Sequence, residues 1–93
     1  MTSLAADIGG TFSRLSWPSP KGSEEQHFSN ADFESLEAVI DHGMALRGIA
    51  GAAIDEMVLA LPGPVHVDPV VLTNINWRVQ RAALQHRYGV RLL

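Results

Sequence analysis

Near the start of the chain stands LAADIGGTFSRLSW, residues 4–17, and the rest of the architecture builds on it. Its first part, Leu4–Ile8, is a short apolar run typical of a β-strand. Gly9-Gly10 ends this run and predicts a tight turn. From Thr11 to Trp17 the side chains alternate between two faces, so this segment is predicted to be a second strand, paired with the first as a hairpin.

The next segments extend this hairpin into a sheet with a helix. Two prolines and a glycine predict a loop over Pro18–Ser23, and the polar segment Glu24–Ser29 is predicted to be a third strand at the sheet edge. Apolar residues then recur at helical spacing from Phe33 to Met44, with Asp32 as the candidate N-cap. Because glycine inside a helix costs about 1 kcal/mol relative to alanine, Gly43 predicts a close approach of this helix to the sheet.

The second half of the chain predicts further strands joined by a helix. Met57–Leu61 is continuously apolar, as in a strand buried on both faces of a parallel sheet. A small hairpin is expected within Val65–Leu72, and a helix at about Arg78–Arg87, ended by Gly89. Val90–Leu93 begins another apolar strand. This order predicts an α/β fold, a mixed sheet with crossover helices.

Composition limits the classes of function. The length of 93 residues allows one small domain, and 46% apolar against 18% charged residues favours a packed core over disorder. A net charge of −3 and the lack of a basic stripe argue against nucleic acid as a partner. The sequence has no cysteine for disulfides or thiolate metal sites. With neither a signal peptide nor a membrane span expected, a cytoplasmic protein is predicted.

The glycine turn is the segment with the clearest potential for chemistry. Gly9 and Gly10 leave backbone N–H groups uncovered by a Cβ atom, so phosphate oxygens can approach them, and the Thr11 hydroxyl adds a donor. Asp7 would repel a phosphate by itself, but Mg²⁺ between them, usually through water, turns this repulsion into a clamp. The alternative is a plain hairpin turn. Neither a Walker loop nor a dinucleotide-binding fingerprint is present.

Taken together, several segments resemble one enzyme family. The string Asp7–Arg14 resembles the first phosphate loop of the sugar kinases in the actin, hexokinase and heat-shock ATPase superfamily. Two later segments, Leu61–Val65 and Thr73–Trp77, resemble a region of bacterial glucokinases in order and spacing, and so does Ser35–Ile40. The resemblance runs along nearly the whole chain. It covers only the leading part of a family member, which is a much longer enzyme of two domains.

This resemblance implies a ribonuclease H-like fold with a mixed five-stranded sheet in the strand order 3-2-1-4-5, its final covering helix missing. It also implies ATP-dependent phosphorylation of glucose at the 6-hydroxyl, with Mg-ATP as cofactor. One set of positions would face the ATP phosphates and Mg²⁺, and a second set would lie near the sugar. The first set is Asp7, Gly9, Gly10 and Thr11, with Asp7 on Mg²⁺ through water; the second is Gly63, Thr73 and Asn74.

The family's catalytic base falls outside this sequence. It is an aspartate in an Asn-Asp pair that follows the strand matching Val90–Leu93, and further sugar ligands, the second phosphate loop and the adenosine pocket come later still. Phosphoryl transfer depends on positioning and charge stabilisation from both sides of the cleft. The resemblance therefore predicts that residues 1–93 form a single truncated amino-terminal subdomain that is inactive alone.

Two other hypotheses stay open beside the glucokinase fragment. One is a non-enzymatic module that keeps weak phosphate binding. The other is a piece that self-associates, because without the covering helix one face of Met57–Leu61 and Val90–Leu93 is bare, which predicts a homo-oligomer. A sugar-responsive repressor is disfavoured, because such proteins carry a DNA-binding helix-turn-helix ahead of the first strand.

Overall fold

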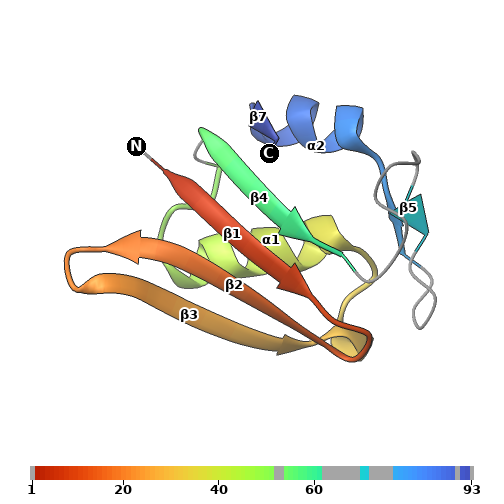
Figure 1. The fold of residues 1–93 in the computed structure, drawn as a ribbon, viewed down its shortest axis with the longest axis horizontal. Helices are drawn as coiled ribbons and strands as arrows, with labels where there is room; N and C mark the ends of the chain where they lie inside the picture. The colour runs from red at the N-terminus through yellow and green to blue at the C-terminus, as the bar shows by residue number, and fades with distance from the viewer. Residues whose placement is uncertain (1, 52–53, 62–69, 72–76, 90, 93) are drawn as a thin grey trace.

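A mixed β-sheet is the central feature of the structure, a computed structural model that describes residues 2–51, 54–61, 70–71, 77–89 and 91–92. The strands lie in the order β3-β2-β1-β4-β7 (Figure 1). Their bounds are β1 Ser3–Ile8, β2 Phe12–Ser19, β3 Gly22–Ser29, β4 Glu56–Ala60 and β7 Arg91–Leu92. β1 pairs antiparallel with β2 and parallel with β4, so the sheet is mixed.

The first four strands follow the predicted order, and the mixed α/β sheet is confirmed. The fifth position is described over a short stretch only. β7 pairs with β4 in parallel through Glu56↔Arg91 and Met57↔Leu92. A full fifth strand over Val90–Leu93 therefore stays a prediction.

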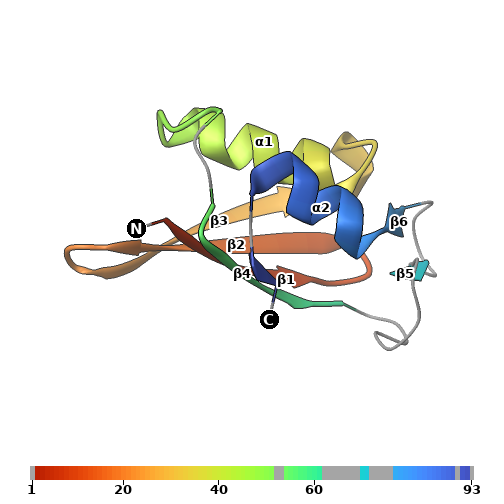
Figure 2. The ribbon, with the colours of Figure 1, turned by 90° about the horizontal axis from the view of Figure 1, so that it is seen from above.

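Two helices, α1 (Leu36–Leu46) and α2 (Arg81–Tyr88), lie on the same side of the sheet (Figure 2). A single turn of 3₁₀-helix, η1 (Asn30–Asp32), follows β3. A separate two-stranded ladder joins β5 (Val70–Val71) to β6 (Arg78–Val79). In the part of the chain that is described, the opposite face of the sheet carries no helix. No helix in the described part of the chain is long and apolar enough to cross a bilayer.

The core lies between the sheet and the two helices. On β2, Ser13, Leu15 and Trp17 are buried while Phe12 and Arg14 are exposed, so the predicted alternation of this strand is confirmed. β1 contributes every second residue to the same face. The remaining core residues from the sheet and the two helices are Leu4, Ala6, Ile8, Leu36, Val39, Ile40, Met44, Met57, Leu84 and Tyr88.

β4 is covered on one face. Met57 is fully buried, but Val58 on the opposite face is 48% exposed. The apolar pattern alone is typical of a strand covered on both faces, whereas the resemblance predicted a bare face on Met57–Leu61 without the covering helix, and the exposure of Val58 agrees with that bare face. The reason is that both helices lie on one side of the sheet, so the alternate side chains of β4 face outward.

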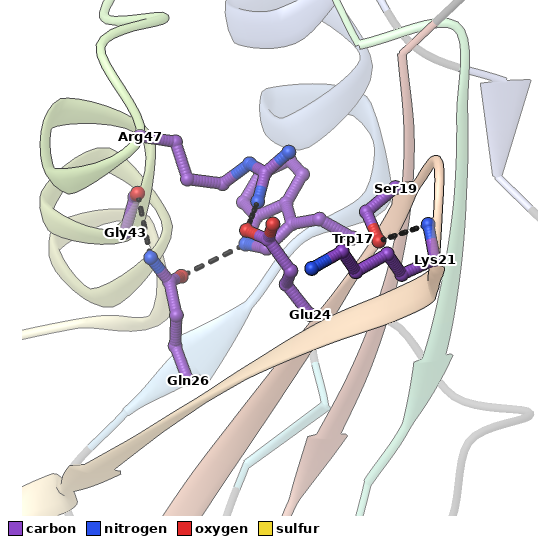
Figure 3. Close-up of polar contacts among 7 residues, drawn as sticks. All are labelled: Trp17, Ser19, Lys21, Glu24, Gln26, Gly43 and Arg47. Atoms are coloured by element: carbon purple, nitrogen blue, oxygen red, sulfur yellow. Dashed lines mark hydrogen bonds and ion pairs between the residues drawn. The ribbon is translucent and has the colours of Figure 1, made fainter.

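The close approach of α1 to the sheet at Gly43 is confirmed. A Cβ atom on Gly43 would lie 2.6 Å from Gln26 Oε1 and 2.7 Å from Leu15 Cδ1. Gln26, on β3, fixes this contact through its side-chain amide (Figure 3). Its Nε2 donates to the Gly43 carbonyl at 3.0 Å, and its Oε1 accepts from Trp17 Nε1 at 2.8 Å.

The predicted loop over Pro18–Ser23 is shorter in the structure, where only Pro20 and Lys21 form a turn between the strands. β2 continues to Ser19 and β3 begins at Gly22, where a φ of 117° suits glycine. Pro18 is tolerated because the pairing of β2 with β1 ends at Ser16, so that among the described residues this part of β2 pairs with β3 alone. A proline lacks a backbone N–H, and a strand with a free edge does not need that donor.

The helix starts also differ from the predictions. Ser35, rather than Asp32, caps α1, and its Oγ accepts from the N–H of Ala38 at 3.1 Å. The second helix begins later than expected, because Arg78–Val79 form β6 and pair with β5. Its predicted end is confirmed, since Gly89 adopts a left-handed conformation with a φ of 63°.

Gln80 is the N-cap residue of α2, and we expect that replacing it with a better capping residue stabilises the fold. Its backbone is extended, with φ −112° and ψ 123°, but its side chain makes no capping hydrogen bond. Gln80→Ser should raise the free energy of unfolding by roughly 0.5–1 kcal/mol, because the hydroxyl can accept from a free N–H of the first turn. Urea denaturation measures this, with Gln80→Ala as control. Equal midpoints for the serine and alanine variants would contradict the prediction.

Candidate functional site

The turn between β1 and β2 is the candidate site. β1 ends at Ile8 and β2 begins at Phe12, so Gly9, Gly10 and Thr11 form the connection. The N–H of Gly9 donates to the Phe12 carbonyl at 2.8 Å, and a Cβ on Gly9 would lie 3.0 Å from that oxygen. Within the described residues, the backbone N–H groups of Gly10 and Thr11 make no hydrogen bond. Both are available to a ligand.

Charged side chains lie beside this turn on the open face of the sheet. The strand register places Asp7 opposite Arg14, and Arg14 opposite His27. Asp7 Oδ2 lies 3.1 Å from Arg14 Nη2, and Arg14 Nε lies 3.3 Å from Glu25 Oε2. These carboxylates and the guanidinium are each about half exposed. Such surface pairs contribute little stability, so a ligand can replace them at low cost.

The turn and these side chains border a shallow pocket. Its volume is ≈ 200 Å³. It brings a carboxylate, a guanidinium and an imidazole next to the first residue of the glycine turn. The lining residues are Asp7, Gly9, Phe12, Ser13, Arg14 and His27.

Two buried polar residues support the turn from the core side. Ser13 and Asn30 are each 1% exposed. Ser13 Oγ donates to Asn30 Oδ1 at 2.5 Å, and Asn30 Nδ2 donates to the Gly9 carbonyl at 2.9 Å. The backbone N–H of Asn30 also donates to the Thr11 carbonyl at 2.9 Å. Asn30 therefore holds carbonyls on both sides of Gly10.

No role for Asn30 was predicted from the sequence. One signal was available, because the alternation of β2 places Ser13 on the buried face with Leu15 and Trp17. A buried hydroxyl needs a hydrogen-bond partner, and in this structure that partner is the Asn30 side chain.

Of the predicted site residues, Asp7, Gly9, Gly10 and Thr11 lie together at the end of β1 and in the following turn. The predicted sugar-side positions, Gly63, Thr73 and Asn74, lie outside the described residues.

The donor set at the turn fits Mg²⁺ that arrives with a nucleotide. Across the described ranges, no group of three or more His, Cys, Asp or Glu residues could hold a metal ion. Mg²⁺ commonly keeps several waters and is held by one or two carboxylates together with substrate phosphates. Asp7, exposed and adjacent to free backbone N–H groups, supplies the protein part of such a set.

A second pocket, of ≈ 410 Å³, lies at the two helices, and its polar groups are already engaged. Asp41 of α1 forms an ion pair with Arg87 and accepts from the Tyr88 hydroxyl at 2.8 Å. Burial raises the pKa of Tyr88, and the hydrogen bond to Asp41 raises it further. These contacts join α2 to α1, which accounts for the cluster without a ligand.

Comparisons with known proteins identify the family of this chain. The Glucokinase family profile matches residues 4–93. The chain is 32% identical over 93 residues to a glucokinase of Yersinia enterocolitica and 37% identical over 101 residues to one of Nitrobacter hamburgensis. These matches cover 97% and 100% of this chain, but only 28% and 30% of the two relatives.

The fold matches as well. The crystal structure of a glucokinase from an Antarctic psychrotroph superposes with a TM-score of 0.80 at 23% sequence identity. That match covers 99% of this chain and 31% of the crystallised one.

Proposed function

Because this chain belongs to the glucokinase family, we propose that it supplies the first phosphate loop of an ATP-dependent glucose kinase, which forms glucose 6-phosphate. The observation that carries this proposal is the glycine turn itself. Free backbone N–H groups of Gly10 and Thr11 lie beside the exposed carboxylate of Asp7 and above a buried polar support. Free backbone N–H groups next to a carboxylate suit a magnesium-bound phosphate.

Each residue of the turn has a distinct role in this proposal. The N–H groups of Gly10 and Thr11, with the Thr11 hydroxyl, donate to phosphate oxygens of ATP. Gly9 keeps the turn tight, since a side chain there would press on the Phe12 carbonyl. Asp7 would hold Mg²⁺ through water, and the ion would supply positive charge against the phosphates.

The rest of the active site is proposed to lie outside these residues. The chain spans 28% and 30% of the length of its two glucokinase relatives. Phosphoryl transfer requires a base for the sugar hydroxyl and donors on the far side of the phosphates. We assign these to the remainder of the enzyme, and place Gly63, Thr73 and Asn74 on the sugar side of the cleft.

A coupled assay for glucose 6-phosphate tests this proposal. We expect no product above background from the 93-residue chain alone. We expect transfer when the chain replaces the matching segment of the psychrotroph glucokinase. Product from the chain alone that scales with protein and disappears in Asp7→Ala would contradict the incomplete site. A folded chimera that binds glucose but transfers no phosphate would contradict the phosphate role.

The family also supports a finer description of the fold. We propose that β7 begins the fifth strand of a ribonuclease H-like core with strand order 3-2-1-4-5. The observed order through β4 and the parallel pairing of β7 support it. Residues 1–93 would then be one truncated subdomain without its final covering helix. The proposed compartment is the cytoplasm, where ATP and glucose are available together.

A second candidate function is self-association through the open sheet face. Val58 is 48% exposed there, and a pocket of ≈ 280 Å³ is lined by Ala5, Pro18 and Val58 among others. Exposed apolar surface of this kind favours association. Light scattering should give at least a dimer mass for the chain, and Val58→Lys should lower that mass. A monomer mass at high protein concentration would contradict this candidate.

A further inference from the structure

We propose that Asn30 is a positioning residue that holds the phosphate turn in its binding shape. This inference rests on the proposed function of the turn. Asn30 lies in η1, directly after β3, and so it links the third strand to the connection between the first two. It makes no contact with the pocket on the open face, and it acts from the buried side of the sheet.

The contacts of Asn30 fix the turn at two points. Its Nδ2 donates to the Gly9 carbonyl at 2.9 Å, and its backbone N–H donates to the Thr11 carbonyl at 2.9 Å. These carbonyls lie on either side of Gly10. With both occupied by Asn30, the peptide groups of the turn have little freedom to rotate, while the N–H groups of Gly10 and Thr11 keep no internal partner among the described residues.

The side chain must be an amide for this arrangement. Asn30 Oδ1 accepts from Ser13 Oγ at 2.5 Å, while Nδ2 must face the Gly9 carbonyl, which can only accept. This carbonyl therefore determines which way the amide is oriented. An aspartate has no donor for Gly9 and would bring a carboxylate close to the carbonyl oxygen.

A fixed turn matters because glycine has more backbone freedom than any other residue. Ordering a loop on ligand binding costs free energy, and a loop that is already ordered binds more tightly. Gly9 and Gly10 would form a poorly defined phosphate site by themselves. Asn30 supplies the order that these glycines lack.

Gln26, on the preceding strand β3, provides a matched control. It also has a partly buried side-chain amide with two hydrogen bonds, one from Trp17 Nε1 and one to the Gly43 carbonyl. These bonds join β3 to β2 and α1 rather than to the turn (Figure 3). Gln26→Ala therefore removes a comparable amide without touching the turn.

The test is a Mg-ATP titration of the ¹⁵N-labelled chain, followed through the amide signals of Gly9, Gly10 and Thr11. For Asn30→Ala and Asn30→Asp we expect binding on the order of tenfold weaker than wild type, the effect of one lost hydrogen bond of about 1.4 kcal/mol. Amide hydrogen exchange at Gly9 should also become faster. For Gln26→Ala we expect an affinity within about twofold of wild type despite lower thermal stability.

Failure of the positioning role of Asn30 can be distinguished from failure of the proposed function. Unchanged Mg-ATP affinity in a folded Asn30→Ala variant overturns the positioning role and leaves the proposed function intact. Absence of binding by the wild-type chain overturns the proposed function at this turn, and the positioning role with it. If Asn30→Ala does not fold, Asn30→Asp tests the same contact, because it keeps an acceptor for Ser13 Oγ but has no donor for the Gly9 carbonyl. A several-fold weaker affinity of that variant supports the role, and an unchanged affinity overturns it.

Discussion

Replacing Gly43 with valine should lower the free energy of unfolding by roughly 3 kcal/mol, a large share of the stability of a domain this small. A Cβ atom at this position would lie 2.6 Å from Gln26 Oε1 and 2.7 Å from Leu15 Cδ1. Neither neighbour can withdraw freely. Leu15 is fully buried, and the Gln26 amide is held by Trp17 and by the Gly43 carbonyl.

Alanine at the same position separates the clash from helix propensity. In an exposed helix, Gly→Ala raises stability by about 1 kcal/mol. In α1 we expect Gly43→Ala to be destabilising, because even one methyl group overlaps its neighbours. The loss should be smaller in a Gln26→Ala background, where one of them has been removed. Urea denaturation followed by tryptophan fluorescence measures these differences. A stabilising Gly43→Ala would contradict the close approach of α1 to the sheet.

The second large effect concerns Asp7. In the chimera that joins this chain to the rest of a glucokinase, Asp7→Asn should lower kcat on the order of 10²–10³-fold, the usual cost of losing one group that stabilises transition-state charge. Asparagine keeps the size of the side chain and loses its negative charge. Folding should be little affected, since Asp7 is exposed and its surface pair with Arg14 contributes under about 1 kcal/mol.

Glu25 is the matched control for Asp7. It is also a half-exposed carboxylate paired with Arg14, but it lies on β3, away from the turn. Glu25→Gln should leave kcat within about twofold of the parent chimera, since only a surface pair is lost. Steady-state kinetics with varied Mg-ATP gives kcat and KM for each protein. Equal effects of the two substitutions would mean that Arg14, rather than Mg-ATP, explains the need for Asp7.

Much of the fold could be predicted because its determinants are local. The alternation on β2 identified the buried face, and glycine indicated both the close contact at Gly43 and the end of α2 at Gly89. The apolar pattern of β4 does not show whether one or both of its faces are covered by another layer. An apolar strand has the same sequence whether one or both faces meet another layer, and the exposure of Val58 depends on where the helices lie.

Element boundaries failed where pairing across the sheet overrode local preference. Proline and glycine indicated a loop at Pro18–Ser23, yet β3 continues to pair with β2 there. Likewise, Arg78 and Val79 were assigned to a helix, and pairing with β5 makes them a strand. Tertiary contacts decide these positions, and a single sequence does not show them.

One part of the candidate site could be predicted from the sequence, and another part could not. Asp7 and the glycine turn are contiguous, so their proximity follows from the hairpin alone. Asn30 lies 21 residues beyond Gly9 and 17 beyond Ser13, and only the completed sheet brings it beneath the turn. The alternation of β2 placed Ser13 on the buried face, but it could not identify Asn30 as its partner.

We propose that the Gly9–Thr11 turn binds the phosphates of Mg-ATP with the help of Asp7. The most direct measurement is a Mg-ATP titration of the ¹⁵N-labelled chain and of Asp7→Ala, each with and without Mg²⁺. We predict saturable amide shifts confined to residues 7–13, which require Mg²⁺ and are lost in Asp7→Ala. Shifts centred elsewhere, or the same shifts in the folded Asp7→Ala variant, would contradict the claim.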